Sequence, residues 1–285
     1  MINAYRQWGH RLARLDPLGL QNFSRLPFLN PAIYGLQPHQ QVFALNESLS
    51  VTDLITRLHY IYGQTLGLEF MHIDNQEEQV WLQQRFEHRT LNFSNTQRLK
   101  FYEYLVKTEK FEQFLHTKFP GAKRFSIEGN DTLIPVLAYI LENIPAYQTR
   151  HLTVGMAHRG RLAVLAHILE KPLPLIMADF QDHSSRKDFP GAGDVKYHQG
   201  YTCQKVFHNN LVTVTMMNNA SHLESVTPIA LGKTYYLQNH DLKKENALDD
   251  ALAVLIHGDA AFSGQGVVAE SLQLSKLAGY HVGGA

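Results

Sequence analysis

Apolar residues recur with helical spacing through residues 1–118. Over residues 1–13 they fall every three or four positions, which predicts an amphipathic helix that ends before Asp16 and Pro17. The same spacing predicts three more helices, over residues 52–62, 75–89 and 96–118. We expect a break in the last helix near Thr108, and a loop over residues 22–46, where no period is visible. This part of the sequence therefore predicts a helical N-terminal region.

Short apolar runs alternate with amphipathic stretches in residues 119–285. Three runs rich in Val, Leu, Ile and Thr predict strands, over residues 152–156, 211–217 and 252–256. A helical pattern follows each run, over residues 160–169, 223–237 and 264–277. This alternation is typical of right-handed βαβ units around a buried parallel sheet. The sequence thus predicts an α/β fold, with residues 1–118 as the helical N-terminal region and residues 119–285 as an α/β domain.

The composition excludes several classes of protein. The 26 Lys and Arg residues balance 26 Asp and Glu residues, and a formal net charge of zero excludes a strongly basic nucleic-acid-binding protein. No uninterrupted apolar run of about 18 residues is present to span a bilayer. The single cysteine, Cys203, permits neither an internal disulfide nor a cysteine-rich zinc site, and it fits a reducing compartment. We therefore expect a globular protein that binds neither nucleic acid nor membranes.

Polar residues follow all three predicted strands. The three polar segments are residues 158–161 (His-Arg-Gly-Arg), 218–222 (Asn-Asn-Ala-Ser-His) and 257–259 (His-Gly-Asp). The carboxyl ends of parallel strands meet at one edge of a sheet, where ligands bind beside the start of the next helix. One edge of the sheet would therefore carry imidazole, guanidinium, amide, hydroxyl and carboxylate groups. This combination suits an anionic ligand together with a metal ion.

Each of these side chains also has a simpler explanation. Asp259 fits an N-cap of the following helix, and His158 fits a hydrogen-bonded histidine that lines the sheet. Arg159 and Arg161 fit partners of surface carboxylates, and His198, in a polar loop, fits an exposed histidine. The sequence contains no His-Glu-x-x-His zinc motif, no complete Gly-x-x-x-x-Gly-Lys-Ser/Thr phosphate-binding loop, no dinucleotide fingerprint and no Gly-x-Ser-x-Gly nucleophile elbow. Generic motifs therefore lead only to an anion site, with or without a metal, on an α/β sheet.

Five longer strings of residues carry a resemblance to a known family. They are FPGAKRFSIEG at 119–129, GMAHRGRL at 155–162, GDVKYH at 193–198, SHLE at 221–224 and HGDAAFSGQG at 257–266. Together they resemble the thiamine-diphosphate-dependent first component of the 2-oxoglutarate dehydrogenases. Strings near the N-terminus fit the same family, so the resemblance is collinear from residue 2 to the last residue.

The resemblance implies a reaction, cofactors and partners. In this family, thiamine diphosphate attacks the keto carbon of 2-oxoglutarate, carbon dioxide leaves, and the succinyl group passes to the lipoyl arm of a partner succinyltransferase in the tricarboxylic acid cycle. The resemblance also implies Mg²⁺ as a second cofactor, dihydrolipoamide dehydrogenase as a further partner and a homodimer for the complete protein. It places such a protein in the bacterial cytoplasm, or in the mitochondrial matrix if the source is eukaryotic. Because the cofactor supplies the electron sink, the protein must orient the substrate and neutralise charge.

The resemblance also implies roles for individual residues. His158 and His198 are expected to be catalytic, and Asp259 to coordinate Mg²⁺. The expected substrate-binding residues are Phe125, His158, Arg159, His198 and Ser221. The expected cofactor-binding residues are Arg159, His198, Ser221, Leu223, Asp259, Ala260 and Ala261.

The sequence departs from the family pattern in places. Ala163 stands where the family has Asn, Asn130 where it has Gly, and Ala220 where it has Pro. The chain ends before the Asn-Asn-Gln string that completes the Mg²⁺ shell in the family, and it lacks the pyrimidine-binding domain. We therefore expect a portion of the enzyme, truncated within its thiamine-diphosphate-binding domain and inactive by itself. Two alternatives remain open: a remnant that acts at most as a structural or binding module, and a relative of the 2-oxoadipate dehydrogenases.

Overall fold

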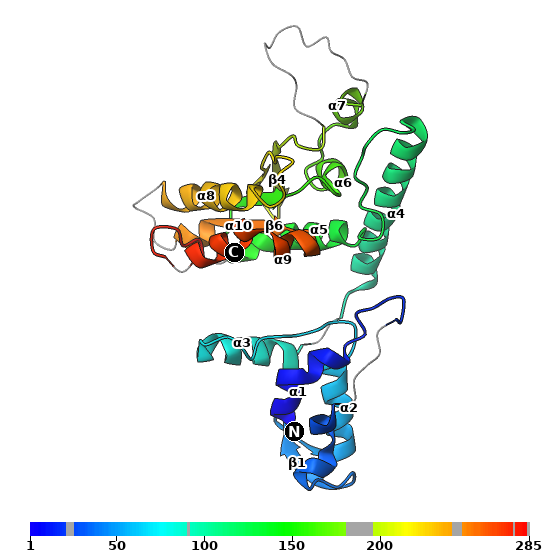
Figure 1. Cartoon of the computed structure of the whole chain (residues 1–285), viewed down its shortest axis with the longest axis vertical. Coiled ribbons are helices and arrows are strands. Elements are labelled where there is room, and N and C mark those ends of the chain that lie inside the picture. The colour runs from blue at the N-terminus through cyan, green and yellow to red at the C-terminus, as the bar shows by residue number, and fades with distance from the viewer. Residues whose placement is uncertain (21–25, 90–91, 181–195, 241–246, 276, 284–285) are drawn as a thin grey trace. The chain divides into compact units, whose positions relative to one another are not determined.

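A computed structural model describes the chain except residues 21–25, 90–91, 181–195, 241–246, 276 and 284–285 (Figure 1). The chain divides into two compact units, residues 1–92 and 93–285. The division falls earlier than the expected boundary after residue 118, because helix α4 (Asn95–Lys118) packs against the core of the second unit through Phe111 and Leu115. No described helix is long and apolar enough to cross a membrane.

The first unit is mostly helical, as its apolar spacing predicts. Its helices are α1 (Ile2–Trp8), η1 (Gly9–Leu12), η2 (Pro27–Leu29), η3 (Pro31–Tyr34), α2 (Val51–Tyr62) and α3 (Gln76–Glu87). The segment expected to be a loop, residues 22–46, contains two of the short helices and the strand β1 (Gln41–Ala44), which pairs antiparallel with β2 (Glu47–Ser50). Strands of four residues are too short to show an alternating pattern, so the spacing of apolar residues does not predict this hairpin.

The second unit alternates strands and helices. Its helices are α4, α5 (Leu133–Asn143), η4 (Ile144–Tyr147), α6 (Arg161–His167), α7 (Leu173–Ala178), α8 (Val226–Asn239), η5 (Ala247–Asp250), α9 (Asp259–Gly264) and α10 (Gly266–Leu274). Its strands are β3 (His151–Met156), β4 (Tyr201–Phe207), β5 (Asn210–Met216) and β6 (Ala251–Ile256). The expected break in α4 is absent, since the helix runs through Thr108, whose hydroxyl donates to the Tyr104 carbonyl one turn earlier.

The four strands form one sheet in the order β4-β5-β3-β6. Strand β3 runs parallel to β5 and β6, so the predicted α/β fold with its parallel strands is confirmed. Strand β4 was not predicted, and it makes the sheet mixed because it pairs antiparallel with β5. His208 and Asn209 connect β4 to β5 with positive φ angles of 47° and 65°, the geometry of a tight two-residue hairpin turn.

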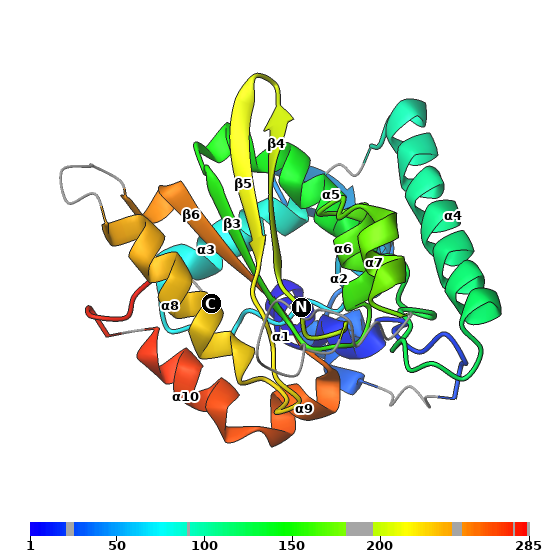
Figure 2. The same ribbon diagram turned by 90° about the horizontal axis from the view of Figure 1, so that it is seen from above.

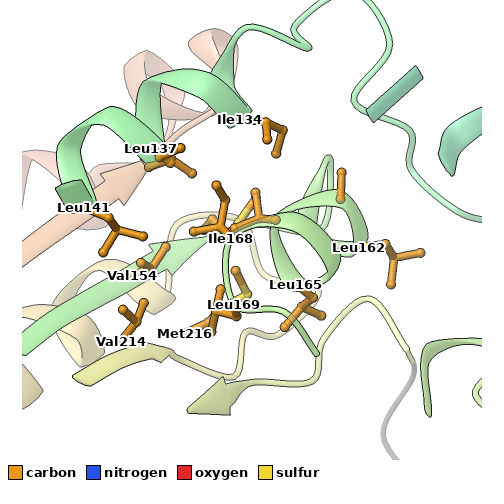
Figure 3. Close-up of a cluster of buried hydrophobic side chains, with 14 of the residues drawn as sticks. Ile134, Leu137, Leu141, Val154, Leu162, Leu165, Ile168, Leu169, Val214 and Met216 are labelled. Atoms are coloured by element: carbon orange, nitrogen blue, oxygen red, sulfur yellow. The ribbon is translucent and has the colours of Figure 1, made fainter. Parts of the chain in front are cut away.

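Helices cover both faces of this sheet (Figure 2). Helices α5 and α6 pack on one face, where their apolar side chains meet those of β3 and β5 (Figure 3). Fully buried members of this core include Ile134, Leu137, Leu152, Val154, Leu165, Val212 and Val214. Helix α8 packs on the other face, where a Cβ atom added to Gly155 would lie 2.9 Å from the Ala230 Cβ. The three-layer arrangement fixes the carboxyl ends of β3, β5 and β6 at one edge.

Candidate functional site

A cavity of about 880 Å³ lies where β3 and β6 end. Its walls come from residues within the segments 127–136, 157–159, 223–224 and 256–261. Ligand sites of open α/β sheets occur at this edge, and their volumes are about 300–1,000 Å³. Six of the nine expected site residues line the cavity: His158, Arg159, Leu223, Asp259, Ala260 and Ala261.

The other three expected residues lie outside the cavity wall. Phe125 contacts His158, with ring centroids 4.1 Å apart, and it also contacts Tyr197 at 4.8 Å. Tyr197 in turn lies edge-on to His198, at 5.1 Å. A row of rings therefore joins His198 and Phe125 to the wall residue His158. Ser221 is exposed and does not reach the cavity wall.

His158 is partly buried directly after β3. Burial lowers the pKa of its imidazole, and the nearby charges of His198, Arg159 and Arg161 lower it further. The imidazole is therefore neutral at pH 7 and has one nitrogen that donates and one that accepts. The neighbouring Arg159 is exposed, and its guanidinium donates to the Ser126 carbonyl at 3.3 Å.

Arg161 is buried at the same edge of the sheet. The simpler explanation that it pairs with a surface carboxylate is therefore wrong. Its side chain is 0% exposed, and its guanidinium donates to the carbonyls of Met156, at the end of β3, and Met217, just after β5. It also donates to the Gln199 carbonyl at 2.9 Å, in the segment that precedes β4. One guanidinium thus holds together two strand ends and the segment that carries His198.

His198 is buried, with 8% of its surface exposed, so the simpler explanation of an exposed histidine is wrong. The Asn219 N–H donates to the His198 carbonyl at 3.1 Å, and the Gly200 N–H donates to the Asn218 side chain. A Cβ atom on Gly200 would lie 2.5 Å from the Met216 carbonyl oxygen, so only glycine permits this close approach. Most of the polar loop before His198, residues 181–195, lies outside the described residues.

Asp259 is exposed in the cavity wall at the first position of α9. Its predicted alternative as an N-cap is wrong, because Gly258 is the N-cap and no side chain caps the helix. Within the described part of the chain, no three His, Cys, Asp or Glu side chains gather to hold a metal ion.

Glu224 and His257 form a pair in the cavity wall that sequence reasoning did not assign to the site. Glu224 is 1% exposed, and its carboxylate Oε2 accepts a hydrogen bond from His257 Nδ1. Two features of the sequence could have pointed to these residues. Glu224 ends the SHLE string, and His257 directly follows the third predicted strand. Their pairing depends on the position of the β5–α8 connection relative to β6, and a sequence pattern does not fix that position.

Several buried polar atoms close to Glu224 in the sequence have no hydrogen-bond partner among the described residues. Three of them belong to the β5–α8 connection and the start of α8: Asn219 Oδ1, Glu224 Oε1 and Thr227 Oγ1. Such atoms are rare in folded proteins and need an explanation, and a ligand is one.

The departures from the family pattern differ in their distance from the cavity. Ala163 is fully buried within the apolar core, and Ala220 is exposed. Asn130 lines the cavity, and its N–H donates to the Ile127 carbonyl at 2.8 Å. Of the three departures, only Asn130 thus lies in the cavity wall.

Residues 103–282, which include every residue of the cavity wall, match the family model described as Dehydrogenase E1 component. The chain belongs to this family. It is 40% identical over 295 residues to the 2-oxoglutarate dehydrogenase E1 component of Rickettsia felis, an alignment that covers 100% of this chain and 30% of the relative. The protein of the same name from Brucella anthropi is 39% identical over 304 residues, again covering 100% of this chain and 30% of the relative. The resemblance carried by the five strings is confirmed, and the chain spans about 30% of the length of these relatives.

Proposed function

We propose that this chain is the part of a 2-oxoglutarate dehydrogenase E1 component that holds thiamine diphosphate, Mg²⁺ and part of the substrate. The observation that carries the proposal is the cavity at the strand ends, where His158, Arg159 and Asp259 share one wall within the family-matched segment. The complete protein would decarboxylate 2-oxoglutarate and transfer a succinyl group to a lipoyl group, as an oxidoreductase of the tricarboxylic acid cycle.

The residues of the cavity fit the two cofactors. Asp259 offers an exposed carboxylate oxygen, the ligand type that Mg²⁺ prefers beside phosphate oxygens. Glu224 Oε1 is a buried acceptor without a partner among the described residues, and it suits an N–H donor. Thiamine diphosphate carries such donors. The further residues proposed to hold the cofactor are Arg159, His198, Ser221, Leu223, Ala260 and Ala261. When bound, thiamine diphosphate supplies the electron sink for decarboxylation.

The substrate carries two carboxylates, and the cavity edge offers donors for them. Arg159 provides an exposed guanidinium, and the neutral imidazole of His158 donates or accepts a hydrogen bond at its side. We propose His158 and His198 as the catalytic histidines, because the row of rings through Phe125 and Tyr197 holds them at the same edge. Phe125 and Ser221 complete the proposed substrate-binding set.

The proposed partners follow from the same reaction. The lipoyl group belongs to a succinyltransferase, and its reoxidation requires dihydrolipoamide dehydrogenase. The complete protein is proposed to be a homodimer of the bacterial cytoplasm, or of the mitochondrial matrix if the source is eukaryotic.

A titration of Mg²⁺ and thiamine diphosphate into the complete polypeptide encoded by the gene tests the proposal. We expect saturable, Mg²⁺-dependent binding by calorimetry and turnover of 2-oxoglutarate in preference to 2-oxoadipate. Asp259→Asn should weaken Mg²⁺-dependent binding about 10-fold or more, because the ion loses a charged ligand. Asp249→Asn, a change to an exposed carboxylate outside the cavity wall, is the matched control and should bind normally.

Three results would contradict the proposal in different ways. Binding without turnover of either diacid would support a structural or binding module instead. Preferential turnover of 2-oxoadipate would identify a relative of the oxoadipate enzymes. Absence of cofactor binding by the complete polypeptide would remove the proposed site altogether.

A further inference from the structure

Lys171 is a buried lysine at the corner between α6 and α7, with 7% of its surface exposed. Its N–H donates to the Leu165 carbonyl in α6 at 2.8 Å. Leu165 is fully buried in the core of the second unit. The preceding residue, Glu170, turns the chain with a positive φ of 52°. The backbone of Lys171 is therefore fixed to the core, and the fold decides where its side chain starts.

The ammonium group of Lys171 donates to two acceptors. One is Asp179 Oδ2, at 3.2 Å, on the residue that caps the C-terminal end of α7. The other is Gln199 Oε1, at 3.0 Å. A buried charge needs an opposite charge close by, and Asp179 supplies it from the same part of the chain. The hydrogen bond to the neutral amide of Gln199 is therefore not needed to balance the charge, and its effect is to hold that amide in place.

Gln199 directly follows His198, and two buried cations hold it at two different atoms. The Arg161 guanidinium donates to its main-chain carbonyl at 2.9 Å, and Lys171 holds its side chain. Arg161 is the first residue of α6, and Lys171 lies just beyond the last turn of the same helix. A residue held at both the carbonyl and the end of its side chain has little freedom to turn. The peptide unit that joins it to His198 is thereby oriented from the core.

The other lysine ion pairs of the described residues differ from this one. They join Lys100 to Glu142, Lys107 to Glu103 and Lys205 to Glu170. The lysine side chains of these pairs are 45%, 57% and 14% exposed, against 7% for Lys171. Among these four pairs, only that of Lys171 also binds a neighbour of a proposed catalytic histidine.

We infer that Lys171 is a positioning residue for His198 and that it acts through the side chain of Gln199. This role rests on the proposed function, in which His198 is catalytic, and it adds a residue that the family resemblance did not supply. A catalytic group displaced by about 1 Å can lose about 100-fold in rate. The hydrogen bond between Lys171 and Gln199 should therefore matter for turnover as well as for stability.

The test replaces the Gln199 side chain in the complete polypeptide and measures kcat/KM for 2-oxoglutarate. Gln199→Met has nearly the same size but offers no oxygen to Lys171, and it leaves the main-chain bond from Arg161 in place. We expect kcat/KM to fall about 10- to 100-fold. Gln199→Glu keeps an acceptor oxygen for the ammonium and should stay within about 3-fold of the unaltered protein.

A second change tests whether the two side chains act together. Lys171→Met should produce the same loss as Gln199→Met, and the variant with both changes should lose no more than either alone, because one hydrogen bond is removed in each case. Lys205→Met is the matched control, since Lys205 is another largely buried lysine in an ion pair, and its partner is the exposed Glu170. This variant should stay within about 3-fold of the unaltered protein.

A third comparison connects the effect to the imidazole itself. In a His198→Ala background, Gln199→Met should lower kcat/KM by less than about a further 3-fold, because no imidazole remains to be misplaced. A purely structural effect of Gln199 would persist in that background.

Several results would overturn the role of Lys171. They are an unchanged kcat/KM in Gln199→Met, an equal loss in Gln199→Glu or Lys205→Met, and a full further loss in the His198→Ala background. If Lys171→Met fails to fold, the two Gln199 variants still decide. An unchanged kcat/KM in His198→Ala itself, or no turnover of 2-oxoglutarate by the unaltered polypeptide, contradicts the proposed function instead.

Discussion

The two parts of the sheet edge around the cavity are held in opposite ways. At the ends of β3 and β5, the buried Arg161 and several backbone hydrogen bonds fix the segment that carries His198. At the end of β6, Asp259 is exposed, and the Glu224–His257 pair is the side-chain hydrogen bond that connects residues 257–261 to another element in the described chain. The histidine side therefore has a geometry built into the fold, whereas the Asp259 side is left open to a ligand. Changes to the groups that hold the first side together should alter stability, and changes to Asp259 on the second side should alter binding.

Replacing Arg161 should have the largest effect of the changes proposed here, and the effect should be on stability. Arg161→Met removes a buried guanidinium and leaves carbonyls at two strand ends without a donor, which should lower the free energy of unfolding by about 3–5 kcal/mol. Arg159→Met, which changes the exposed neighbour, should alter it by less than about 0.5 kcal/mol. Urea denaturation of both variants measures the difference. Equal stability of the two would show that the histidine side is not held by Arg161.

Replacing His158 should lower turnover without the same loss of stability. His158→Ala removes the hydrogen bond that we propose between this imidazole and a charged substrate group, so kcat/KM for 2-oxoglutarate in the complete protein should fall about 10- to 150-fold. His39→Ala, at an exposed position of the first unit, serves as the control. Unchanged kcat/KM in the first variant would remove His158 from the proposed catalytic residues.

The close approach at Gly200 offers a test that adds atoms instead of removing them. Gly200→Ala places a methyl group 2.5 Å from the Met216 carbonyl oxygen, which should destabilise the protein by about 1–3 kcal/mol. Gly232→Ala, within α8 and with no atom near the new methyl group, should stabilise it by up to about 1 kcal/mol. Thermal unfolding of both variants is the measurement. Similar melting temperatures would mean that the segment before β4 moves easily.

The smallest expected effect is on the pH dependence of stability. Burial lowers the pKa of His151, His158 and His167 below the usual value of 6.5. The unfolded chain then binds protons more readily than the folded chain as the pH falls below 6.5, so stability should decrease in that range. His167→Gln should reduce the slope of melting temperature against pH between pH 5 and 6.5. A slope identical to that of the unaltered protein would contradict this assignment.

The sequence predicted correctly those strands that a single apolar pattern identifies. Strands β3, β5 and β6 appear within one residue of their expected limits, because apolar runs between turn residues leave few other structures open. The antiparallel strand β4 was missed, because Lys205 occupies one of its partly buried positions and Val206 an exposed one, which breaks the apolar alternation typical of a strand. Helix α5 was missed as well, since it is apolar on most of its surface and contains Pro135.

The location of the site was predictable from the order of strands and helices along the chain. Strand ends in an α/β sheet converge, and this convergence brings His158 and Asp259 to one cavity. The burial of Arg161 was not predictable, since it depends on three segments that meet only in the folded unit. The same holds for the Oε1 atom of Glu224, whose lack of a partner becomes visible only when all neighbouring donors are placed.

The use of arginine at position 161 has a consequence for kinetics. A guanidinium stays charged at every pH at which the protein is folded, so the hydrogen bonds that hold the segment around His198 do not titrate. The imidazole of His158, whose pKa is lowered, gains a proton only as the pH falls, and the hydrogen bonds of Arg161 stay in place when it does. A plot of kcat/KM against pH for the complete enzyme would then report proton transfer at the reacting groups, free of any change in the shape of this side of the cavity.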